Sequence, residues 1–429
     1  MVRMTAFLAA AVIALGAGTT APARAAPEAP ATAPARIDKA RIDKALAEMV
    51  ASGRAAGASA VVWQDGKERY FGATGFADLE AKRPMARDTL VQIFSMTKPV
   101  TGVVLMQLWE QGKFQLDDPL AKYLPEFAEM RFYAGTDAAG APLYKPTTRP
   151  ILVRDILRHT AGFSYAMRST PADAAFRAAN PLDITNDLPE FGRRLGKLPL
   201  LFDPGKEWSY SVGVDVQALL VEKLTGVPFE TYAREHVLAP LGMKDTAWTE
   251  PPSNLPRLAA TYVRGAGGKL ARQPDARTQT LNFSPQRRLT MGGAGLASTL
   301  DDYLRFSRML LNGGELDGVR LLKPSTVRLM ATDQLDPSVK ERFFLPGKGA
   351  VGFGLDFAVR KSPPQDAKEN RGAVGEFFWD GAETTLFWVD PANHLTAVFF
   401  VQVLPFDATL HHDFRQAVYG PAYLGPKGD

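Results

Sequence analysis

The stretch Phe94-Ser95-Met96-Thr97-Lys98-Pro99 joins a short apolar run, residues 89–94, to a helical pattern that reaches about residue 111. Proline is accepted only in the first turn of a helix, because it lacks an N–H and its ring clashes with the preceding turn. Pro99 therefore predicts that the helix begins near Ser95. The Ser95 hydroxyl then lies at the helix N-terminus, where unpaired backbone N–H groups favour a developing negative charge.

Lys98 follows Ser95 by three residues, and residues three apart share one face of a helix. Serine is a weak nucleophile until a neighbour takes its proton, and a desolvated lysine with a lowered pKa can do this. The sequence holds no other Ser-x-x-Lys. The alternative is an N-cap serine followed by a solvated lysine. The apolar run before Ser95 favours a nucleophile activated by Lys98.

A tyrosine later in the chain could assist such a pair. Tyr210 lies in Trp208-Ser209-Tyr210-Ser211-Val212, after the turn Asp203-Pro204-Gly205 and before a helix expected near residue 214. A loop tyrosine more often serves packing. A phenol beside an ammonium can nevertheless lose its proton and act as a general base.

The segment Phe378-Trp379-Asp380-Gly381-Ala382 ends a strand-like run. A glycine at a strand edge lets another backbone approach closely. The N–H that follows Gly381 could therefore pair with the Ser95 N–H as an oxyanion hole. The alternative is a hairpin turn with a core tryptophan.

The order of helix and strand patterns predicts the fold class. Strand-like runs at 58–63 and 69–74 flank Gln64-Asp65-Gly66-Lys67, and Asp-Gly is a strong hairpin signal. Strand patterns return at 353–359, 375–378, 384–389 and 396–403, between a first helix at 37–50 and a closing helix at 408–423. Helical pieces occupy 153–159, 214–224, 229–237 and 300–311, and the Gly/Pro/Thr-rich segment 133–150 indicates a long loop.

These patterns predict an α+β protein with a sheet domain built from both ends of the chain, residues 37–119 and 346–429. A mainly helical domain, residues 120–345, is inserted between the two parts.

The first 36 residues predict export. Arg3 precedes an apolar run at 6–18, and Ala23-Arg24-Ala25 offers the small residues that a signal peptidase requires. We expect a signal peptide at 1–25 and an Ala/Pro-rich linker at 26–36. No cysteine follows the apolar run and no later segment resembles a membrane span, so we expect a periplasmic or secreted protein without a membrane anchor.

Several function classes are disfavoured. Removal of residues 1–25 takes away Arg3 and Arg24 and no acid, so the net charge falls from +4 to +2. The remaining Lys and Arg are scattered among acids, which argues against nucleic-acid binding. With no cysteine, thiol chemistry is excluded.

Known motifs of other hydrolases are also missing. The chain has no Gly-x-Ser-x-Gly elbow, and its histidines show no zinc-binding spacing, so we expect no metal. His159 ends a helix beside a glycine and is interpreted as structural. Gly292-Gly293-Ala294-Gly295 lacks the Lys-Ser/Thr of a phosphate-binding loop and is expected to let the chain pass close to the site. The five histidines are His159, His236, His394, His411 and His412.

Taken together, Ser95-x-x-Lys98, Tyr210 and Trp379-x-Gly381 resemble the motifs of the serine β-lactamase and penicillin-binding protein superfamily, in its class C-like branch. The chain is most similar there to the family VIII carboxylesterases. The resemblance spans residue 37 to the end. It also rests on the stretches Leu157-Arg158-His159-Thr160-Ala161-Gly162, Asp203-Pro204-Gly205-Lys206-Glu207-Trp208-Ser209-Tyr210-Ser211 and Gly295-Leu296-Ala297-Ser298-Thr299.

The resemblance implies an antiparallel sheet flanked by helices, a helical domain, and a site in the cleft between them. It implies that Ser95 is the acylated nucleophile, Lys98 its activating partner and Tyr210 the general base. The N–H groups of Ser95 and Ala382 would form the oxyanion hole. The implied chemistry uses no cofactor.

Departures from the class C pattern bear on the substrate. Val212 stands where those enzymes carry an asparagine, and Trp379-Asp380-Gly381 replaces their Lys-Thr-Gly. The loss of an amide and of an anion-recognising pair disfavours anionic substrates. We therefore expect a carboxylesterase for short acyl esters. A β-lactamase or D-amino-acid peptidase, an amidase or acyltransferase, and a sensor that is acylated without turnover remain alternatives. The oligomeric state stays open.

Overall fold

A computed structural model describes residues 35–425. The predicted signal peptide lies outside the described residues, as does the predicted linker except for its last two residues. Export therefore stays a prediction. Within residues 35–425, no helix is both long and apolar enough to cross a membrane.

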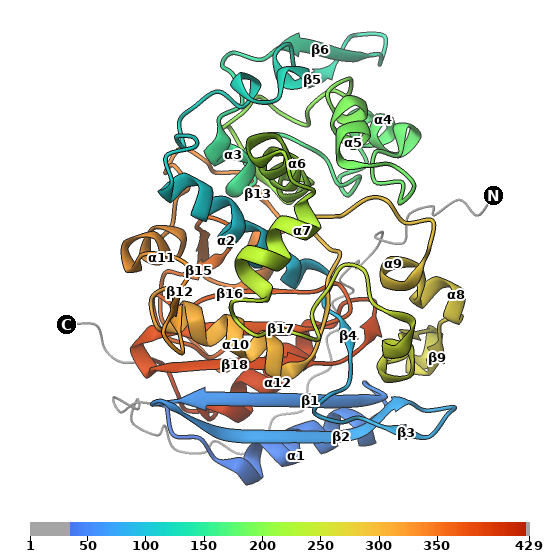
Figure 1. Cartoon of the computed structure of the whole chain (residues 1–429), viewed down its shortest axis with the longest axis vertical. Coiled ribbons are helices and arrows are strands. Elements are labelled where there is room, and N and C mark those ends of the chain that lie inside the picture. Colours follow the sequence, from blue (N-terminus) through green and yellow to red (C-terminus); the bar gives the residue numbers. More distant parts are fainter. Residues whose placement is uncertain (1–34, 426–429) are drawn as a thin grey trace.

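An eight-stranded sheet unites the two ends of the chain (Figure 1). Its strand order is β14-β15-β16-β17-β18-β1-β2-β3, and every neighbouring pair is antiparallel. The strands are β14 (Val351–Phe353), β15 (Ala358–Arg360), β16 (Phe377–Asp380), β17 (Leu386–Asp390), β18 (Leu395–Phe400), β1 (Gly57–Gln64), β2 (Lys67–Asp78) and β3 (Arg83–Pro84). The predicted hairpin turn joins β1 to β2, with Asp65 at φ 51° and Gly66 at φ 76°.

Helices cover both faces of this sheet. Successive residues of a strand point to opposite faces, so the side chains of Phe387 and Trp388 of β17 lie on opposite faces of the sheet. Phe387 packs against Tyr303 of α10 (Leu300–Leu311), whereas Trp388 packs against Phe414 of α12 (Ala408–Tyr419). Helix α1 (Lys39–Ala51) lies against α12. The predicted α+β class with an antiparallel sheet flanked by helices is confirmed.

The remaining helices lie mainly beyond one face of the sheet (Figure 1). Helix α2 (Thr97–Glu110) is buried along most of its length and packs on α6 (Gly213–Thr225). Further helices are α3 (Val153–Leu157), α4 (Pro171–Ala179), α5 (Leu188–Leu195), α7 (Phe229–Ala233) with its π-helical continuation η4 (Arg234–Leu238), α8 (Asp275–Thr278), α9 (Thr280–Phe283) and α11 (Pro324–Met330). The exact domain boundaries stay a prediction.

Short strands tie the connecting segments together. They are β4 (Val91–Gln92) with β10 (Ala297–Ser298), β7 (Trp208–Ser209) with β13 (Arg342–Phe343), β11 (Glu315–Leu316) with β12 (Val319–Arg320), and β19 (Val403–Leu404) with β8 (Tyr262–Arg264) and β9 (Leu270–Arg272).

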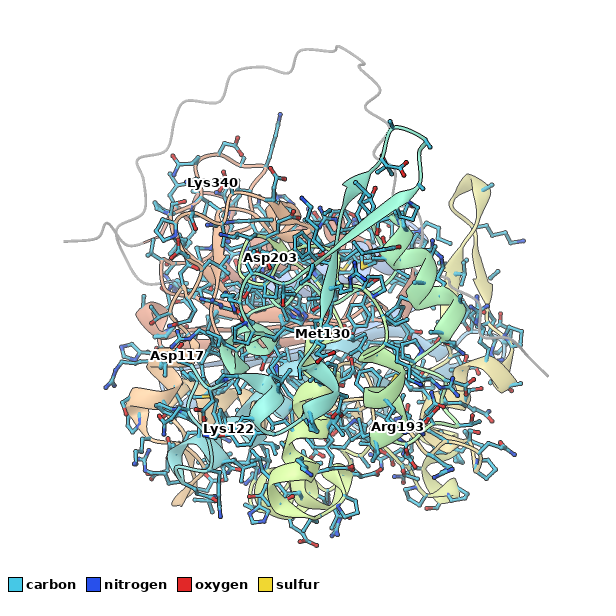
Figure 2. All side chains as sticks on the ribbon, turned by 90° about the horizontal axis from the view of Figure 1, so that it is seen from above. Asp117, Lys122, Met130, Arg193, Asp203 and Lys340 are labelled. Atoms are coloured by element: carbon cyan, nitrogen blue, oxygen red, sulfur yellow. The ribbon has the colours of Figure 1, made fainter. Side chains whose placement is uncertain are left out.

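The segment 133–150, predicted as a loop, largely forms a hairpin. Strands β5 (Arg131–Thr136) and β6 (Pro142–Pro146) pair antiparallel and extend beyond the helices around them in Figure 2. The rings of Tyr133 and Tyr144 lie opposite each other with centroids 6.3 Å apart. The Asp137 side chain accepts N–H groups in the turn. Cross-strand pairing thus overrides the Gly/Pro content of this segment.

The run 353–359, predicted as one strand, is two strands and a turn. Asp356 in this turn has φ 64°, and its carboxylate is buried and accepts a hydrogen bond from Gln217. This backbone reversal cannot be read from an apolar run. The closing helix also ends earlier than predicted, at Tyr419, before Gly420 at φ 92°.

Candidate active site

Ser95 lies in a tight turn immediately before the central helix. The 3₁₀ turn η1 (Phe94–Met96) runs directly into α2, so the predicted helix start near Ser95 is confirmed with a 3₁₀ first turn. Phe94 has φ 45°, in the left-handed region that a bulky residue rarely adopts. Such backbone conformations concentrate at functional sites, where the surrounding structure holds them in place. The side chain of Ser95 is half-buried.

Lys98 reaches Ser95 as the helical spacing predicts. Its Nζ lies 3.3 Å from Ser95 Oγ. The same Nζ donates to the carbonyl oxygen of Gly293 at 2.7 Å and to the hydroxyl of Tyr165 at 3.3 Å. The side chain is only 1% exposed, so these contacts replace water around the amine.

Burial lowers the pKa of Lys98 to about 8. The charged form loses its hydration in the interior, and this cost exceeds the opposing attraction of Asp215, Asp356 and Asp380. A lysine with this pKa is neutral in an appreciable fraction of molecules near physiological pH. It can therefore accept a proton from Ser95.

Tyr210 lies beside the same two residues. Its hydroxyl hydrogen-bonds with Ser95 and accepts from Trp379 Nε1 at 3.3 Å, while Lys98 Nζ lies 4.6 Å from its ring centroid. Burial raises the pKa of Tyr210, and the hydrogen bonds from Ser95 and Trp379 only partly offset this. Of the two groups, Lys98 is thus the one able to accept a proton near neutral pH, and Tyr210 carries its proton in the resting site.

The oxyanion candidates lie where β16 ends against the turn before Ser95. Gly381 packs so closely on the Ile93 carbonyl that a Cβ at position 381 would clash with it. Neither the Ser95 N–H nor the Ala382 N–H takes part in a backbone hydrogen bond within residues 35–425. Both amides are therefore free to donate to a substrate oxygen.

Two of the predicted substrate-binding residues have roles inside the protein. Val212 precedes α6 with its side chain completely buried. Trp379 is 1% exposed, and its indole N–H is used by Tyr210. Trp379 thus contacts the site through Tyr210, whereas Val212 is part of the hydrophobic core.

Asp380 does not present a free negative charge to a substrate, because it is ion-paired inside the protein. Lys348 Nζ forms an ion pair with Asp380 Oδ2, and His411 Nδ1 lies 3.9 Å from the same oxygen. Both partners of the ion pair are buried. Sequence reasoning missed Lys348 because it lies 32 residues from Asp380 and the fold alone brings them together.

Replacing Lys348 with methionine is expected to lower the free energy of unfolding by about 3–5 kcal/mol, because it leaves the Asp380 carboxylate buried and unpaired. Urea denaturation of the variant measures this loss. A double variant, Lys348→Met with Asp380→Leu, should recover most of it, since a packed apolar pair avoids the desolvation cost. Equal stability of Lys348→Met and the native protein would contradict the ion pair.

Tyr165 and Asp215 complete the surroundings of Lys98, and sequence reasoning did not find them. The Tyr165 hydroxyl lies 3.2 Å from Asp215 Oδ2, and the Gly293 N–H donates to Asp215 Oδ1 at 3.0 Å. A Cβ at Gly293 would lie 2.7 Å from the Tyr165 hydroxyl and 3.2 Å from Lys98 Nζ. The expected close passage of the glycine run is confirmed. The only local signal for Asp215 was its position five residues after Tyr210.

His159 supports Tyr210 from the side. Its Nδ1 lies 3.1 Å from Ser211 Oγ, and its ring packs 5.0 Å from that of Tyr210. Burial, helped by the nearby Lys98 charge, lowers the pKa of His159 well below its usual range. The ring is therefore neutral, in agreement with the structural role expected for it.

The rate of ester cleavage is expected to follow the neutral form of Lys98. Because protonated Lys98 cannot accept the Ser95 proton, kcat/KM should rise about tenfold per pH unit below pH 7 and level off above about pH 8. A pH profile with an uncharged ester measures this rise.

Titration of Glu383 could produce a similar rise in rate, because this residue follows Ala382 and burial raises its pKa to about 8 as well. The two contributions can be distinguished with a variant. Its carboxyl is hydrogen-bonded to Thr261 Oγ1. Glu383→Gln keeps that geometry without a titrating group, and the rise in rate should persist in this variant. Loss of the rise in Glu383→Gln would assign it to Glu383.

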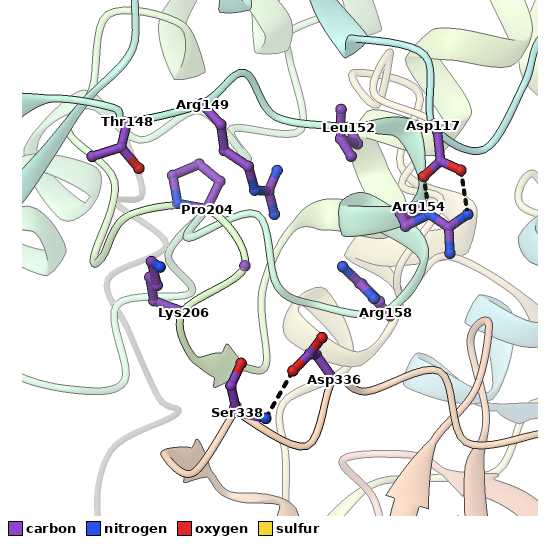
Figure 3. A pocket seen from close by; sticks show the side chains of 11 residues that line it. Asp117, Thr148, Arg149, Leu152, Arg154, Arg158, Pro204, Lys206, Asp336 and Ser338 are labelled. Carbon is purple, nitrogen blue, oxygen red and sulfur yellow. Dashed lines mark hydrogen bonds and ion pairs between the residues drawn. The ribbon is translucent and has the colours of Figure 1, made fainter.

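A polar cavity of about 500 Å³ has Arg158 and Lys206 in its lining (Figure 3). Arg154 faces Asp117 across one end of it, and Arg149 and Arg158 both pair with Asp155. The Gly205 N–H in its wall donates to the Thr160 carbonyl at 2.8 Å. The arginines that line this cavity are ion-paired with acids. We therefore interpret these pairs as structural contacts that hold the surrounding loops in place.

No group of three or more His, Asp or Glu side chains within residues 35–425 has an arrangement that could hold a metal ion.

Comparisons with known proteins identify relatives that match most of this chain. The model of the Beta-lactamase family matches residues 42–419. Protein Rv1367c of Mycobacterium tuberculosis is 36% identical over 375 residues, which cover 84% of this chain and 89% of that protein. Esterase EstB of Burkholderia gladioli is 30% identical, with 84% and 89% covered. The solved structure of EstCE1, described as a hydrolase with promiscuous acyltransferase activity, superimposes with a TM-score of 0.72 at 26% identity, covering 89% of this chain and 98% of that one.

Proposed function

The chain belongs to the beta-lactamase family of serine hydrolases, and from this membership we propose that it is a carboxylesterase for short acyl esters that works through an acyl-enzyme on Ser95. The observation that carries the proposal is the 3.3 Å contact between Ser95 Oγ and the Nζ of Lys98, whose pKa burial lowers to about 8. This pair supplies a nucleophile and a base without any further group.

Acylation begins when Ser95 Oγ attacks the ester carbonyl and neutral Lys98 accepts its proton. The carbonyl oxygen becomes negative and receives hydrogen bonds from the Ser95 and Ala382 amides. The bond to the alcohol then breaks, and the leaving alkoxide takes the proton of Tyr210. Lys98, which lies against the ring of Tyr210, returns its proton to the phenolate. The acyl-enzyme thus forms with Lys98 neutral and Tyr210 protonated.

Deacylation repeats these steps with water as the nucleophile. Water loses a proton to Lys98 and attacks the acyl carbonyl, whose oxygen again lies between the two amides. The tetrahedral intermediate collapses with release of the acid, and the leaving Ser95 Oγ takes the proton of Tyr210. Lys98 then passes the proton that it took from water to the Tyr210 phenolate, which restores the resting site. The resemblance implied that Tyr210 is the general base. We propose instead that it donates, because burial keeps it protonated in the resting site and an alkoxide is basic enough to take that proton.

Neutral esters are favoured as substrates by the charges around the site. The ammonium of Lys348 is ion-paired with the buried carboxylate of Asp380, so it is not available to bind a substrate carboxylate. The relative Esterase EstB, 30% identical over most of both chains, is an esterase by name, which supports an ester as the substrate.

Acyl transfer to an alcohol is the second candidate. EstCE1 is described as having promiscuous acyltransferase activity, and it shares 26% of its aligned residues with this chain. In the mechanism above, an alcohol that replaces water in the second half would yield a new ester. Transfer thus needs no additional group.

A rate panel tests the proposal. The purified protein is mixed with p-nitrophenyl butyrate, nitrocefin and a D-Ala-D-Ala peptide, with and without an added alcohol, and initial bursts and steady rates are recorded. The proposal expects the highest kcat/KM for the butyrate ester. A far higher kcat/KM for nitrocefin or the peptide would replace it with a β-lactamase or peptidase. A burst without turnover would indicate a sensor.

A further inference from the structure

Phe344 is an aromatic residue in an unfavourable backbone conformation at the edge of the site. Its φ is 79°, where bulky side chains are rare, and its side chain is 37% exposed. Its ring lies almost parallel to that of Tyr210, with an interplanar angle of 19° and centroids 5.4 Å apart. Phe344 thus combines a left-handed backbone conformation with an exposed ring stacked on Tyr210, a residue of the proposed mechanism. Such conformations concentrate at functional sites, which points to a function for this ring.

The segment around Phe344 is fixed on both sides. Before it, β13 (Arg342–Phe343) pairs with β7 (Trp208–Ser209), the strand that leads into Tyr210, and the Trp208 N–H donates to the Glu341 carbonyl at 2.8 Å. After it, the 3₁₀ turn η7 (Leu345–Lys348) ends at Lys348, which is ion-paired to Asp380. Phe344 is therefore held against Tyr210 rather than placed there by a free loop.

Lys348 also connects Phe344 with Trp379. Its ammonium lies 4.9 Å from the ring centroid of Phe344 and 5.4 Å from that of Trp379. Cations favour this position over aromatic faces. Phe344, Tyr210 and Trp379 thus form one connected aromatic wall, of which Phe344 is the most exposed member.

We propose that Phe344 determines specificity for the alcohol portion of the ester, and that it favours aromatic or other bulky apolar alcohols. This inference rests on the proposed function, in which Tyr210 gives its proton to the leaving alcohol. The atom that receives this proton lies beside the Tyr210 hydroxyl, so the rest of the alcohol extends along the wall that contains Phe344. Exposed aromatic faces bind apolar and aromatic groups by offset stacking and exclusion of water.

The test uses esters that share one acyl group and differ in the alcohol. For benzyl butyrate, Phe344→Ala is expected to lower kcat/KM about tenfold, while for methyl butyrate it changes by less than about twofold. A series of methyl esters with acyl chains of different lengths should keep its order of rates. Phe76→Ala is the matched control, because Phe76 is 38% exposed on β2 and has no contact with Tyr210 among the ring contacts of the described residues.

Partition of the acyl-enzyme gives a second readout. With p-nitrophenyl butyrate as donor, the ratio of transfer to benzyl alcohol over hydrolysis should fall in Phe344→Ala, whereas the ratio for methanol stays constant. Phe344→Leu keeps bulk and loses the ring, so its transfer ratio for benzyl alcohol should lie between those of the native protein and Phe344→Ala. It serves as the test variant if Phe344→Ala does not fold.

Equal losses for benzyl and methyl butyrate would overturn the proposal, and so would a change in acyl-chain preference alone. These outcomes differ from failure of the proposed function, in which the native protein itself would cleave no ester or form no acyl-Ser95.

Discussion

Replacing Ser95 with alanine is expected to lower kcat/KM for p-nitrophenyl butyrate by about 10⁴- to 10⁶-fold. The variant keeps Lys98, Tyr210 and the two amides, but no atom remains at position 95 to form the acyl bond. Residual rates would come from binding and from stabilisation of the oxyanion. Steady-state kinetics with the purified variant measure the loss, and the initial burst should disappear.

The exposed Ser325 of α11 provides a matched control, since Ser325→Ala removes one hydroxyl from the surface. This variant should keep the native rate and the native melting temperature. If Ser95→Ala retained a rate within about tenfold of the native protein, another nucleophile would carry the reaction, because loss of a true nucleophile costs far more.

Replacing Lys98 with methionine is expected to lower kcat/KM by about 10²- to 10⁴-fold, the range that a positioned base contributes. Methionine has a similar length, so the helix and its packing on α6 are kept. Without an amine near Ser95 Oγ, the serine must lose its proton to water. The rise in rate with pH should also vanish, because the group that titrates near pH 8 has been removed.

Lys98→Arg separates the base from the positive charge. Arginine keeps its proton at all relevant pH values, so it supplies charge without accepting the Ser95 proton. A loss as large as that of Lys98→Met would support the base, whereas a nearly native rate in Lys98→Arg would show that only the charge matters. Lys113→Met, at an exposed lysine just after α2, controls for the loss of a lysine.

The pairing of Ser95 with Lys98 could be predicted because it is local. They are three positions apart where a 3₁₀ turn runs into α2, and Pro99 fixes where that helix starts. The hairpin at Asp65-Gly66 was equally local, since the turn residues themselves select its geometry. Tyr210 could be named only from chemistry and from the resemblance, but the structure brings it to Ser95.

What sequence could not reveal depends on contacts between distant segments. Lys348 contacts Asp380 because the segment after β13 lies against the end of β16. The spacing of the two residues in the sequence gives no sign of this contact. The network of Tyr165, Asp215 and Gly293 joins three separate segments. Strand turns showed the same limit: the reversal at Asp356 and the pairing of Tyr133 with Tyr144 are set by neighbours rather than by local composition.

Acylation of Ser95 is tested most directly by mass spectrometry of the protein quenched within milliseconds of mixing with p-nitrophenyl butyrate. We predict one butyryl group per molecule, on the peptide that contains Ser95, and this group decays at the rate of turnover. A butyryl group on another residue, or rapid turnover with no adduct on Ser95, would contradict this prediction.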